Sequence, residues 1–322
     1  MRDIYITKSG CLKQNENTLL FETEKDSIRI PVKEVSSIHI LNEMQLSTRL
    51  LQFLSKNHIP VYFYNYYGSF VGCFSPREEY PSGKVIVNQV LHYHSPLLRL
   101  QIARQMVEAA IHNIRKTLMQ YGIESARIDS IIEKCAYASS IESLMGLEGN
   151  AREEYYSKFN TILKNEYFNF NIREFDPPSN RINALISFGN SLLYNTVLSQ
   201  IFRTPLDPRI SFVHEPFERR YSLNLDLADI FKPLIVDRVI FTMINKNMFS
   251  TDDFRVETDY CFLNDAGRKK FIQTYDEKLK QTIKHPTLKR SVSYRHLIRI
   301  ECYKLVKHLL EEKTYQSFRI YW

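Results

Sequence analysis

The spacing of apolar residues changes from strand-like to helical near residue 80, and this change constrains the fold more than any other feature of the chain. Before it, short runs rich in β-branched and aromatic residues are separated by polar turns, as at residues 15–17 and 24–26. After it, apolar residues recur at helical spacing. With 322 residues, which favours two domains, we predict an α+β fold: a small β-rich N-terminal domain (residues 1–90) and a larger all-α C-terminal domain (residues 91–322).

The expected elements follow this division. Strands are predicted at residues 4–7, 19–23, 27–32, 37–41, 61–64 and 69–74, with one helix among them at residues 46–56. Prolines and a glycine within residues 75–83 predict a linker, and Ser95-Pro96 predicts the start of a long helix that ends near Gln120. Further helices are predicted at about residues 129–145, 148–163, 181–202, 226–246, 265–283 and 291–312, and the polar residues 252–265 predict a flexible loop.

Composition narrows the class of protein. The chain has 43 basic and 36 acidic residues, and this surplus of +7 suits a polyanionic partner as well as it suits an ordinary basic surface. Only 9 glycines are present and no glycine-rich phosphate loop occurs, which argues against a nucleotide cofactor. The five scattered cysteines argue against a zinc cluster or a disulfide framework, and neither a signal peptide nor an apolar run of ~20 residues occurs. We expect a cytoplasmic protein without a membrane span.

The first segment that could carry chemistry is residues 146–156. We expect it to begin a helix in which Glu148 stands between two glycines, which allow a backbone or a ligand to come close. At helical spacing, Glu148, Arg152 and Tyr155 share one face. Considered alone, an ordinary surface ion pair between Glu148 and Arg152 is the commoner explanation of this pattern.

Two further segments bring a histidine and two carboxylates. His214 stands at the end of an apolar stretch before Pro216, where its imidazole could bind a divalent ion. Asp226 and Asp229 are three positions apart at the start of a predicted helix, and Lys232 follows three positions later. Considered alone, a core histidine and ordinary acidic residues at a helix N-terminus are the commoner explanations.

Together, the three segments favour a metal site. One glutamate, one histidine and one or two aspartates are ligands that Mg²⁺ or Mn²⁺ accepts, and phosphodiester chemistry uses such an ion. Basic residues in or near the same segments are candidates for holding a DNA backbone: Arg152, Arg209, Arg219, Arg220 and Lys232.

Four sequence blocks also occur in the order and approximate spacing of a known family: GLEGNAREEYY, NALISFGNSLLY, LDPRISFVHEP and SLNLDLADIFKP. Over its whole length, the chain resembles the CRISPR-associated endonuclease and integrase family, which contains the catalytic protein of CRISPR adaptation. The run YFYNYYGSFVGCFSPRE is similar to the type I-B branch of that family.

The resemblance implies a β-rich domain that forms a homodimer and a helical catalytic domain. Carried over by motif, Glu148, His214 and Asp229 are the metal ligands and catalytic residues, and Asp226 is a further acid close to them. Lys232 and Tyr194 match positions near the DNA substrate, which makes Tyr194 a further candidate DNA contact. The implied partner is a small ferredoxin-like protein, whose dimer bridges two catalytic dimers into a heterohexameric complex.

The expected function is insertion of short DNA fragments, called spacers, into a CRISPR array. The 3′-hydroxyl of the fragment attacks a phosphodiester at the edge of a repeat, and water attacking instead gives nuclease activity. Alternatives are an integrase of a mobile element, a DNA-repair nuclease that acts on branched DNA, and a non-catalytic DNA-binding scaffold whose acids only stabilise helix N-termini.

Aromatic residues are dense between Tyr62 and Phe70, with six in nine positions. This number exceeds what the core of a small β-domain needs. We expect these rings to fill the core and a dimer interface, with stacking on DNA bases as the alternative.

Overall fold

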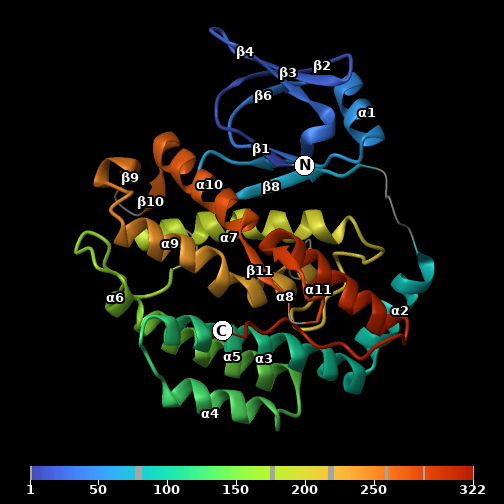
Figure 1. Cartoon of the computed structure of the whole chain (residues 1–322), viewed down its shortest axis with the longest axis vertical. Helices are drawn as coiled ribbons and strands as arrows, with labels where there is room; N and C mark the ends of the chain where they lie inside the picture. Colours follow the sequence, from blue (N-terminus) through green and yellow to red (C-terminus); the bar gives the residue numbers. More distant parts are fainter. Residues whose placement is uncertain are drawn as a thin grey trace.

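The computed structural model describes residues 2–76, 82–174, 178–216, 221–257, 260–285 and 287–321. Strands make up the N-terminal part and helices most of the C-terminal part, so the predicted α+β fold class is confirmed (Figure 1). Helix α2 (Gly83–His94) begins before residue 90, and a domain boundary at that residue stays a prediction. Within these described ranges, no helix is both long and apolar enough to cross a membrane.

The described N-terminal strands form two sheets, with strand orders β1-β5-β7-β8 and β4-β3-β2-β6. Their bounds are Arg2–Ile6 (β1), Gly10–Asn15 (β2), Thr18–Glu22 (β3), Ser27–Pro31 (β4), Val35–Ile40 (β5), Met44–Leu46 (β6), Val61–Tyr64 (β7) and Phe70–Phe74 (β8), with a 3-10 turn at Val32–Glu34 and helix α1 at Thr48–Lys56. Strands β2 and β6 were not predicted. They are extended because they pair with each other and because β2 also pairs with β3, which a polar sequence such as GCLKQN does not reveal.

The first sheet separates two cores, because successive side chains of a strand point to opposite faces. On β5, Ile38 and Ile40 pack in the smaller core with α1 and the second sheet. On the opposite face, the ring of His39 stacks on Tyr62, which belongs to the large core formed mainly by helices. The sheet is therefore attached to the helical part through a buried face.

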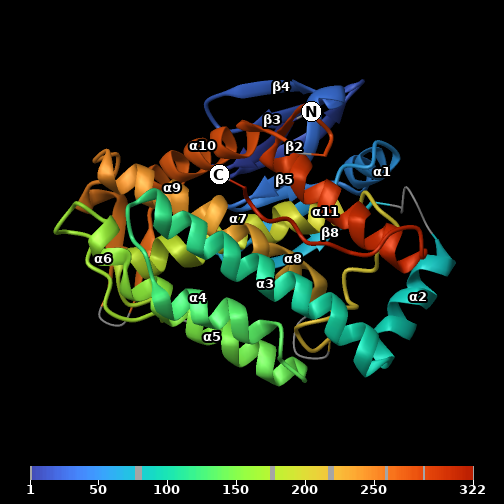
Figure 2. The same cartoon turned by 60° about the horizontal axis from the view of Figure 1, so that its bottom comes forward.

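The helices surround α7 (Arg181–Ile201), of which all but four of the 21 residues are buried. Figure 1 shows α7 crossing the middle of the molecule below the first sheet, and Figure 2 shows α3, α4 and α5 in front, on the side of α7 away from that sheet. The other bounds are Pro96–Gln120 (α3), Ala126–Cys135 (α4), Ile141–Ser157 (α5), Phe159–Ile162 (α6), Ser222–Phe231 (α8), Val236–Asn245 (α9), Asp265–Lys280 (α10) and Tyr294–Leu309 (α11).

The predicted helix boundary between residues 145 and 148 is wrong. Helix α5 begins at Ile141, because the side chain of Ser140 accepts a hydrogen bond from the backbone N–H of Ser143 and caps the helix. The helix then continues through both glycines to Ser157. Glu148 consequently lies in the middle of a helix and not at its start.

The single helix predicted at residues 226–246 is also wrong. Helix α8 ends at Phe231, a 3-10 turn follows at Lys232–Leu234, and α9 begins at Val236. Pro233 has no N–H to donate and its ring obstructs the preceding turn, so the helix breaks there.

Short hairpins interrupt the helical part. Strands β9 (Phe254–Val256) and β10 (Cys261–Leu263) pair within the predicted loop at residues 252–265, after a 3-10 turn at Thr251–Asp253. A second pair, β11 (Thr282–Lys284) and β12 (Ser291–Ser293), precedes α11. The C-terminal part is therefore mostly, and not entirely, helical.

A directed chain of buried hydrogen bonds connects α7 to the first sheet. The Ser37 hydroxyl donates to Asp3 Oδ1 (2.7 Å), so its oxygen accepts from His39 Nε2–H (3.0 Å). Nδ1 of the same ring then accepts from the Tyr64 hydroxyl (2.8 Å), whose oxygen accepts from Asn195 Nδ2–H (2.6 Å). Burial lowers the pKa of His39 to about 4, so the ring is neutral at pH 7, as this arrangement requires.

We expect Tyr64→Phe to lower the free energy of unfolding by about 2 kcal/mol. Asn195 and His39 each lose a buried partner, and an unpaired buried group costs about 1–3 kcal/mol. Urea denaturation followed by circular dichroism measures the change. Tyr137→Phe is the control, because Tyr137 is 87% exposed. Equal stability of the two variants would contradict the hydrogen-bond chain.

Candidate functional site

Glu148 lies on α5 between two glycines, Gly146 and Gly149. A Cβ atom added to Gly146 or Gly149 would meet no described atom within 4 Å, so these glycines do not serve close packing within the chain. They leave open space on α5 beside the glutamate. Tyr155, predicted to share its face, is 1% exposed and belongs to the core.

Arg152 connects the two carboxylates of the predicted triad. Its Nη2 lies 2.7 Å from Glu148 Oε1 and 2.9 Å from Asp229 Oδ1, and its Nε–H donates to Glu148 at 2.8 Å. The Arg152 side chain is only 20% exposed. The guanidinium thus joins α5 to α8 and stands between the two acids.

Asp229 has a second cation beside it. Lys232 Nζ lies 2.5 Å from Asp229 Oδ1. Burial alone would raise the pKa of Asp229, but the charges of Arg152, Lys232 and His214 outweigh it and lower the pKa to about 2. Oδ1 is buried and lies beside both the ammonium of Lys232 and the guanidinium of Arg152. Asp229 is therefore held in its charged form by two neighbouring cations.

Asp226 organises the loop that carries His214. Its Oδ2 accepts from the backbone N–H groups of Phe212 (2.6 Å) and Val213 (3.0 Å), and its Oδ1 accepts from that of His214 (3.0 Å). Oδ1 also lies 2.7 Å from His214 Nδ1, which must donate because the carboxylate cannot. The lone pair of the neutral imidazole is therefore on Nε2.

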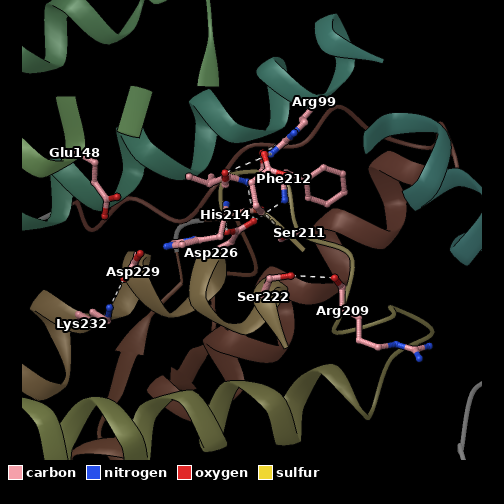
Figure 3. Close-up of polar contacts among 12 residues, drawn as sticks. Arg99, Glu148, Arg209, Ser211, Phe212, His214, Ser222, Asp226, Asp229 and Lys232 are labelled. Carbon is pink, nitrogen blue, oxygen red and sulfur yellow. Dashed lines mark hydrogen bonds and ion pairs between the residues drawn. The ribbon is translucent and has the colours of Figure 1, made fainter. Parts of the chain in front are cut away.

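The charges around His214 favour its protonated form when no cation is bound. Burial alone lowers the pKa of His214, but the hydrogen bond with Asp226 and the negative charges of Asp226, Asp229 and Glu148 raise it above its ordinary value. Figure 3 shows the side chains of Glu148, Asp229 and His214 turned toward a common space.

Arg99 and Ser211 donate hydrogen bonds to backbone carbonyl groups of the loop that carries His214. Arg99, on α3, donates through Nε to the Phe212 carbonyl (2.9 Å), and the Ser211 hydroxyl donates to the His214 carbonyl (2.6 Å). The sequence analysis missed both residues. Nothing in the spacing of the long helix distinguishes Arg99 from its other basic residues, since its partners lie more than 110 positions away.

Of the other residues predicted to contact DNA, some lie at the candidate site and some lie away from it or outside the described residues. Lys232 Nζ lies 4.9 Å from the centroid of the Tyr194 ring, which places Tyr194 at the edge of the site. Arg209 pairs with Asp207, at 2.5 Å between Nη2 and Oδ2, and its side chain is 71% exposed. Arg219 and Arg220 lie outside the described residues. The predicted DNA contacts of all these residues stay predictions.

In the described part of the chain, no group of three or more His, Cys, Asp or Glu side chains is close enough to hold a metal ion. At the predicted triad the physical reason is Arg152, whose guanidinium stands between Glu148 and Asp229. The arrangement supplies oxygen and nitrogen ligands next to two cations that can bind phosphate.

A family model described as CRISPR associated protein Cas1 matches residues 4–277. A curated relative from Thermodesulfovibrio yellowstonii, named CRISPR-associated endonuclease Cas1 3, is 47% identical over 326 residues, with 100% of this chain and 100% of the relative covered.

Solved structures give a consistent comparison. A Cas1 protein from Thermotoga maritima has a TM-score of 0.92 and 40% sequence identity, over 99% of this chain and 100% of that one. A casposase bound to an integration product has a TM-score of 0.87 over 98% of this chain and 93% of that one. Its identity of 20% makes this a likeness of fold alone.

We expect Asp226→Asn to loosen the His214 loop. The asparagine amide offers one acceptor oxygen to the four donors that now share the Asp226 carboxylate. Its NH₂ group cannot accept a hydrogen bond, so some of these N–H groups lose their partner. The backbone amides of Phe212, Val213 and His214 should exchange at least tenfold faster in hydrogen–deuterium exchange, which corresponds to about 1.4 kcal/mol. Asp129→Asn, at a half-exposed carboxylate on α4, is the control. Unchanged exchange in Asp226→Asn would contradict the role given to this carboxylate.

Proposed function

Because this chain belongs to the family of CRISPR-associated Cas1 proteins, we propose that it is a divalent-metal-dependent DNA endonuclease and integrase that inserts short DNA fragments into a CRISPR array. The family membership confirms the resemblance found in the sequence, while assignment to type I-B stays a prediction. The observation that carries the proposal is the opposition of Glu148 and Asp229 around one guanidinium, beside a histidine oriented by Asp226.

The residues present fit a divalent cation. Two carboxylates and one imidazole nitrogen form a donor set suited to Mg²⁺ or Mn²⁺, and Asp229, whose pKa is lowered to about 2, is charged at neutral pH. We infer that Glu148, His214 and Asp229 would hold the ion. When bound, such an ion supplies Lewis-acid polarisation of a phosphoryl oxygen and favours deprotonation of the attacking group. Asp226 has the role of the outer carboxylate that fixes a ligating histidine.

The chain's own cations prepare the site for a phosphodiester. Lys232 is held between Asp229 and the ring of Tyr194, and Arg152 is held by two carboxylates. Both would neutralise charge on the phosphoryl oxygens in the transition state. Arg152 occupies the position between the acids, and its guanidinium would be available to the DNA if a bound cation took that position.

The proposed integration step is a transesterification. The 3′-oxygen of the fragment forms a bond to phosphorus in the target strand, and the bond from that phosphorus to the target's own 3′-oxygen breaks. The fragment hydroxyl loses its proton and the departing 3′-oxygen gains one, so neither oxidant nor energy source is needed. With water as the attacking group, the same rearrangement is endonuclease hydrolysis.

DNA is the proposed substrate, and a homodimer with the small ferredoxin-like partner is the proposed assembly. The casposase likeness shows that this fold also occurs in a protein bound to an integration product, so a mobile-element integrase is the second candidate. Target choice separates the two: joining at a CRISPR repeat supports adaptation, and joining only at terminal inverted repeats supports the mobile element. DNA binding without any product in Mn²⁺ would support a scaffold.

We expect Glu148→Gln and His214→Ala each to reduce strand transfer and cleavage by at least about 100-fold, since each removes a member of one catalytic unit. The assay uses Mn²⁺, a labelled fragment with a 3′-hydroxyl and a duplex that contains a repeat. Glu153→Gln, on the same helix but 70% exposed, is the matched control. Wild-type rates in both Glu148→Gln and His214→Ala would refute the site.

We expect Arg152→Gln to lower thermal stability without metal and to increase the stabilisation by Mn²⁺. Without the guanidinium, the buried Asp229 and the partly buried Glu148 lose their shared cation, which costs about 3 kcal/mol for a broken buried pair. Mn²⁺ can then replace that charge, and binding to the folded state raises the melting temperature. Differential scanning calorimetry in EDTA and in Mn²⁺ measures both effects.

Arg127→Gln provides the control for this experiment. Arg127 pairs with Glu153 on the surface, and its side chain is 51% exposed. Its loss should change neither the stability in EDTA by more than about 0.5 kcal/mol nor the response to Mn²⁺. A Mn²⁺ shift in Arg152→Gln no larger than that of wild type would show that Arg152 does not compete with a cation.

A further inference from the structure

A groove of about 960 Å³ lies between α3, the turn after β11, α11 and the last residues of the chain. It shares no lining residue with the candidate site. Its volume is near the upper end of the range of roughly 300–1,000 Å³ that is typical of small-molecule sites. None of its described lining residues is acidic, and five are lysines or arginines: Arg104, Lys304, Lys307, Lys313 and Arg319. We call it the basic groove.

A buried carboxylate fixes the wall of the basic groove that the last residues form. Glu301, on α11, is 0% exposed. Its Oε1 accepts from the Tyr315 hydroxyl (2.7 Å) and from the backbone N–H of Phe318 (3.1 Å). Its Oε2 accepts from Lys304 Nζ (2.9 Å). From α3, Asn113 Nδ2–H donates to the Phe318 carbonyl (3.1 Å). Because α3 and α11 both hold this wall, the shape of the groove is set by the fold.

The positive charge of the basic groove is only partly compensated. Lys304 and Arg319 each pair with a glutamate. The other three cations have no carboxylate partner in the part of the chain that the structure describes: Arg104, Lys307 and Lys313. Arg104 donates through Nη2 to the Ala138 carbonyl (2.8 Å), but its buried Nε has no partner there either. Three like charges that face one groove repel one another, and an anion between them would remove this repulsion.

A nearly buried imidazole adds a neutral donor to the basic groove. His285 lines the groove and is 6% exposed. Its Nδ1 accepts from the backbone N–H of Leu288 (3.2 Å), so the proton of the neutral ring is on Nε2. Burial and the charges of Lys304 and Arg290 lower the pKa of His285, which keeps the ring neutral at pH 7. Among the described residues, Nε2–H has no acceptor. An acceptor oxygen in the groove would satisfy it.

These groups favour a compact anion with several negative charges. They come from four separate segments of the chain and line one groove, so a small ligand can contact them together. Phosphate oxygens accept hydrogen bonds from ammonium, guanidinium and imidazole donors alike. No open Phe or Tyr ring is available for a nucleobase in the described lining, because Tyr315 and Phe318 are 2% and 4% exposed. A DNA duplex is too wide to enter a groove of this volume and reach the nearly covered His285.

We propose that the basic groove binds a small polyphosphate, which is a linear chain of phosphate groups that is either free or carried by a nucleoside. Arg104, Lys307 and Lys313 contact the phosphate oxygens, and His285 donates to one of them through Nε2. The ligand thereby joins α3 and α11 to the last residues of the chain and stabilises the folded state. The proposal goes beyond the proposed function, because no residue of the candidate site takes part in it.

Isothermal titration calorimetry of the full chain with sodium tripolyphosphate in EDTA tests the proposal. We expect saturable binding of one tripolyphosphate per chain at a salt concentration of about 0.15 M. The double variant Lys307→Gln/Lys313→Gln should bind at least about tenfold more weakly, because two charge-assisted contacts are lost. Both lysines are exposed, so the variant should fold as wild type does. Absence of saturable binding to wild type would overturn the proposal.

The variant His285→Asn tests the neutral donor separately. The asparagine side-chain oxygen can still accept from the Leu288 N–H, but no donor remains at the position of Nε2. Tripolyphosphate binding should weaken roughly tenfold, as for the loss of one hydrogen bond to a charged group. Wild-type affinity in this variant or in the lysine double variant would overturn the proposal.

A matched control separates the basic groove from general attraction to a basic protein. Lys33→Gln/Lys134→Gln makes the same change of charge at two exposed lysines elsewhere and should bind tripolyphosphate as wild type does. An equal loss of affinity in this control would overturn the proposal, because the attraction would then depend on net charge alone.

Further titrations identify the source of the phosphate chain. Tighter binding of ATP than of tripolyphosphate would assign a nucleoside triphosphate, and equal or weaker binding of ATP would assign inorganic polyphosphate. Inorganic phosphate that binds as tightly as tripolyphosphate would overturn the proposal. So would a blunt DNA duplex that loses as much affinity as tripolyphosphate in Lys307→Gln/Lys313→Gln, since the groove would then be part of a DNA-binding surface.

Discussion

The saturation of one buried carboxylate determines the geometry of the candidate site. Asp226 is 2% exposed, and a carboxylate so far from water is stable only when its oxygens accept hydrogen bonds. Three backbone N–H groups of the loop and the ring of His214 meet this requirement. The same contacts fix the path of the loop and the direction of the imidazole. The hydrogen bonds that stabilise the buried carboxylate therefore also set the geometry of the site.

Opposite charges hold together the other four residues of the site, which are Glu148, Asp229, Arg152 and Lys232. Arg152 stands between Glu148 and Asp229 and contacts both, and Lys232 adds a second positive charge at Asp229. In a region of low dielectric, removing one member of such a group costs more than any pair contributes. The position between the two acids is therefore occupied by the guanidinium of Arg152.

Helix α7 relates the candidate site to the remainder of the fold. Its buried faces join the first sheet, through Asn195 and Tyr64, to the helices that carry the candidate site residues. Tyr194, one of the four residues of α7 that are not buried, lies beside Lys232 at the candidate site.

The sequence alone determined the features that depend on local spacing. The alternation at residues 61–64 and the apolar periodicity of residues 181–202 predicted β7 and α7 closely, and the change of period near residue 80 predicted the fold class, because these patterns arise within a few residues of one another. Family blocks singled out Glu148, His214 and Asp229, although local patterns alone favoured ordinary explanations for each.

Only the tertiary structure decided what depends on partners far apart in the chain. It showed the strands β2 and β6 through their pairing, Arg99 through its contact with the loop, and Arg152 as the group between two acids. It also brought Tyr67 against Tyr260 and Phe262. Such contacts depend on chain closure and burial over many residues, and no short sequence window contains both partners.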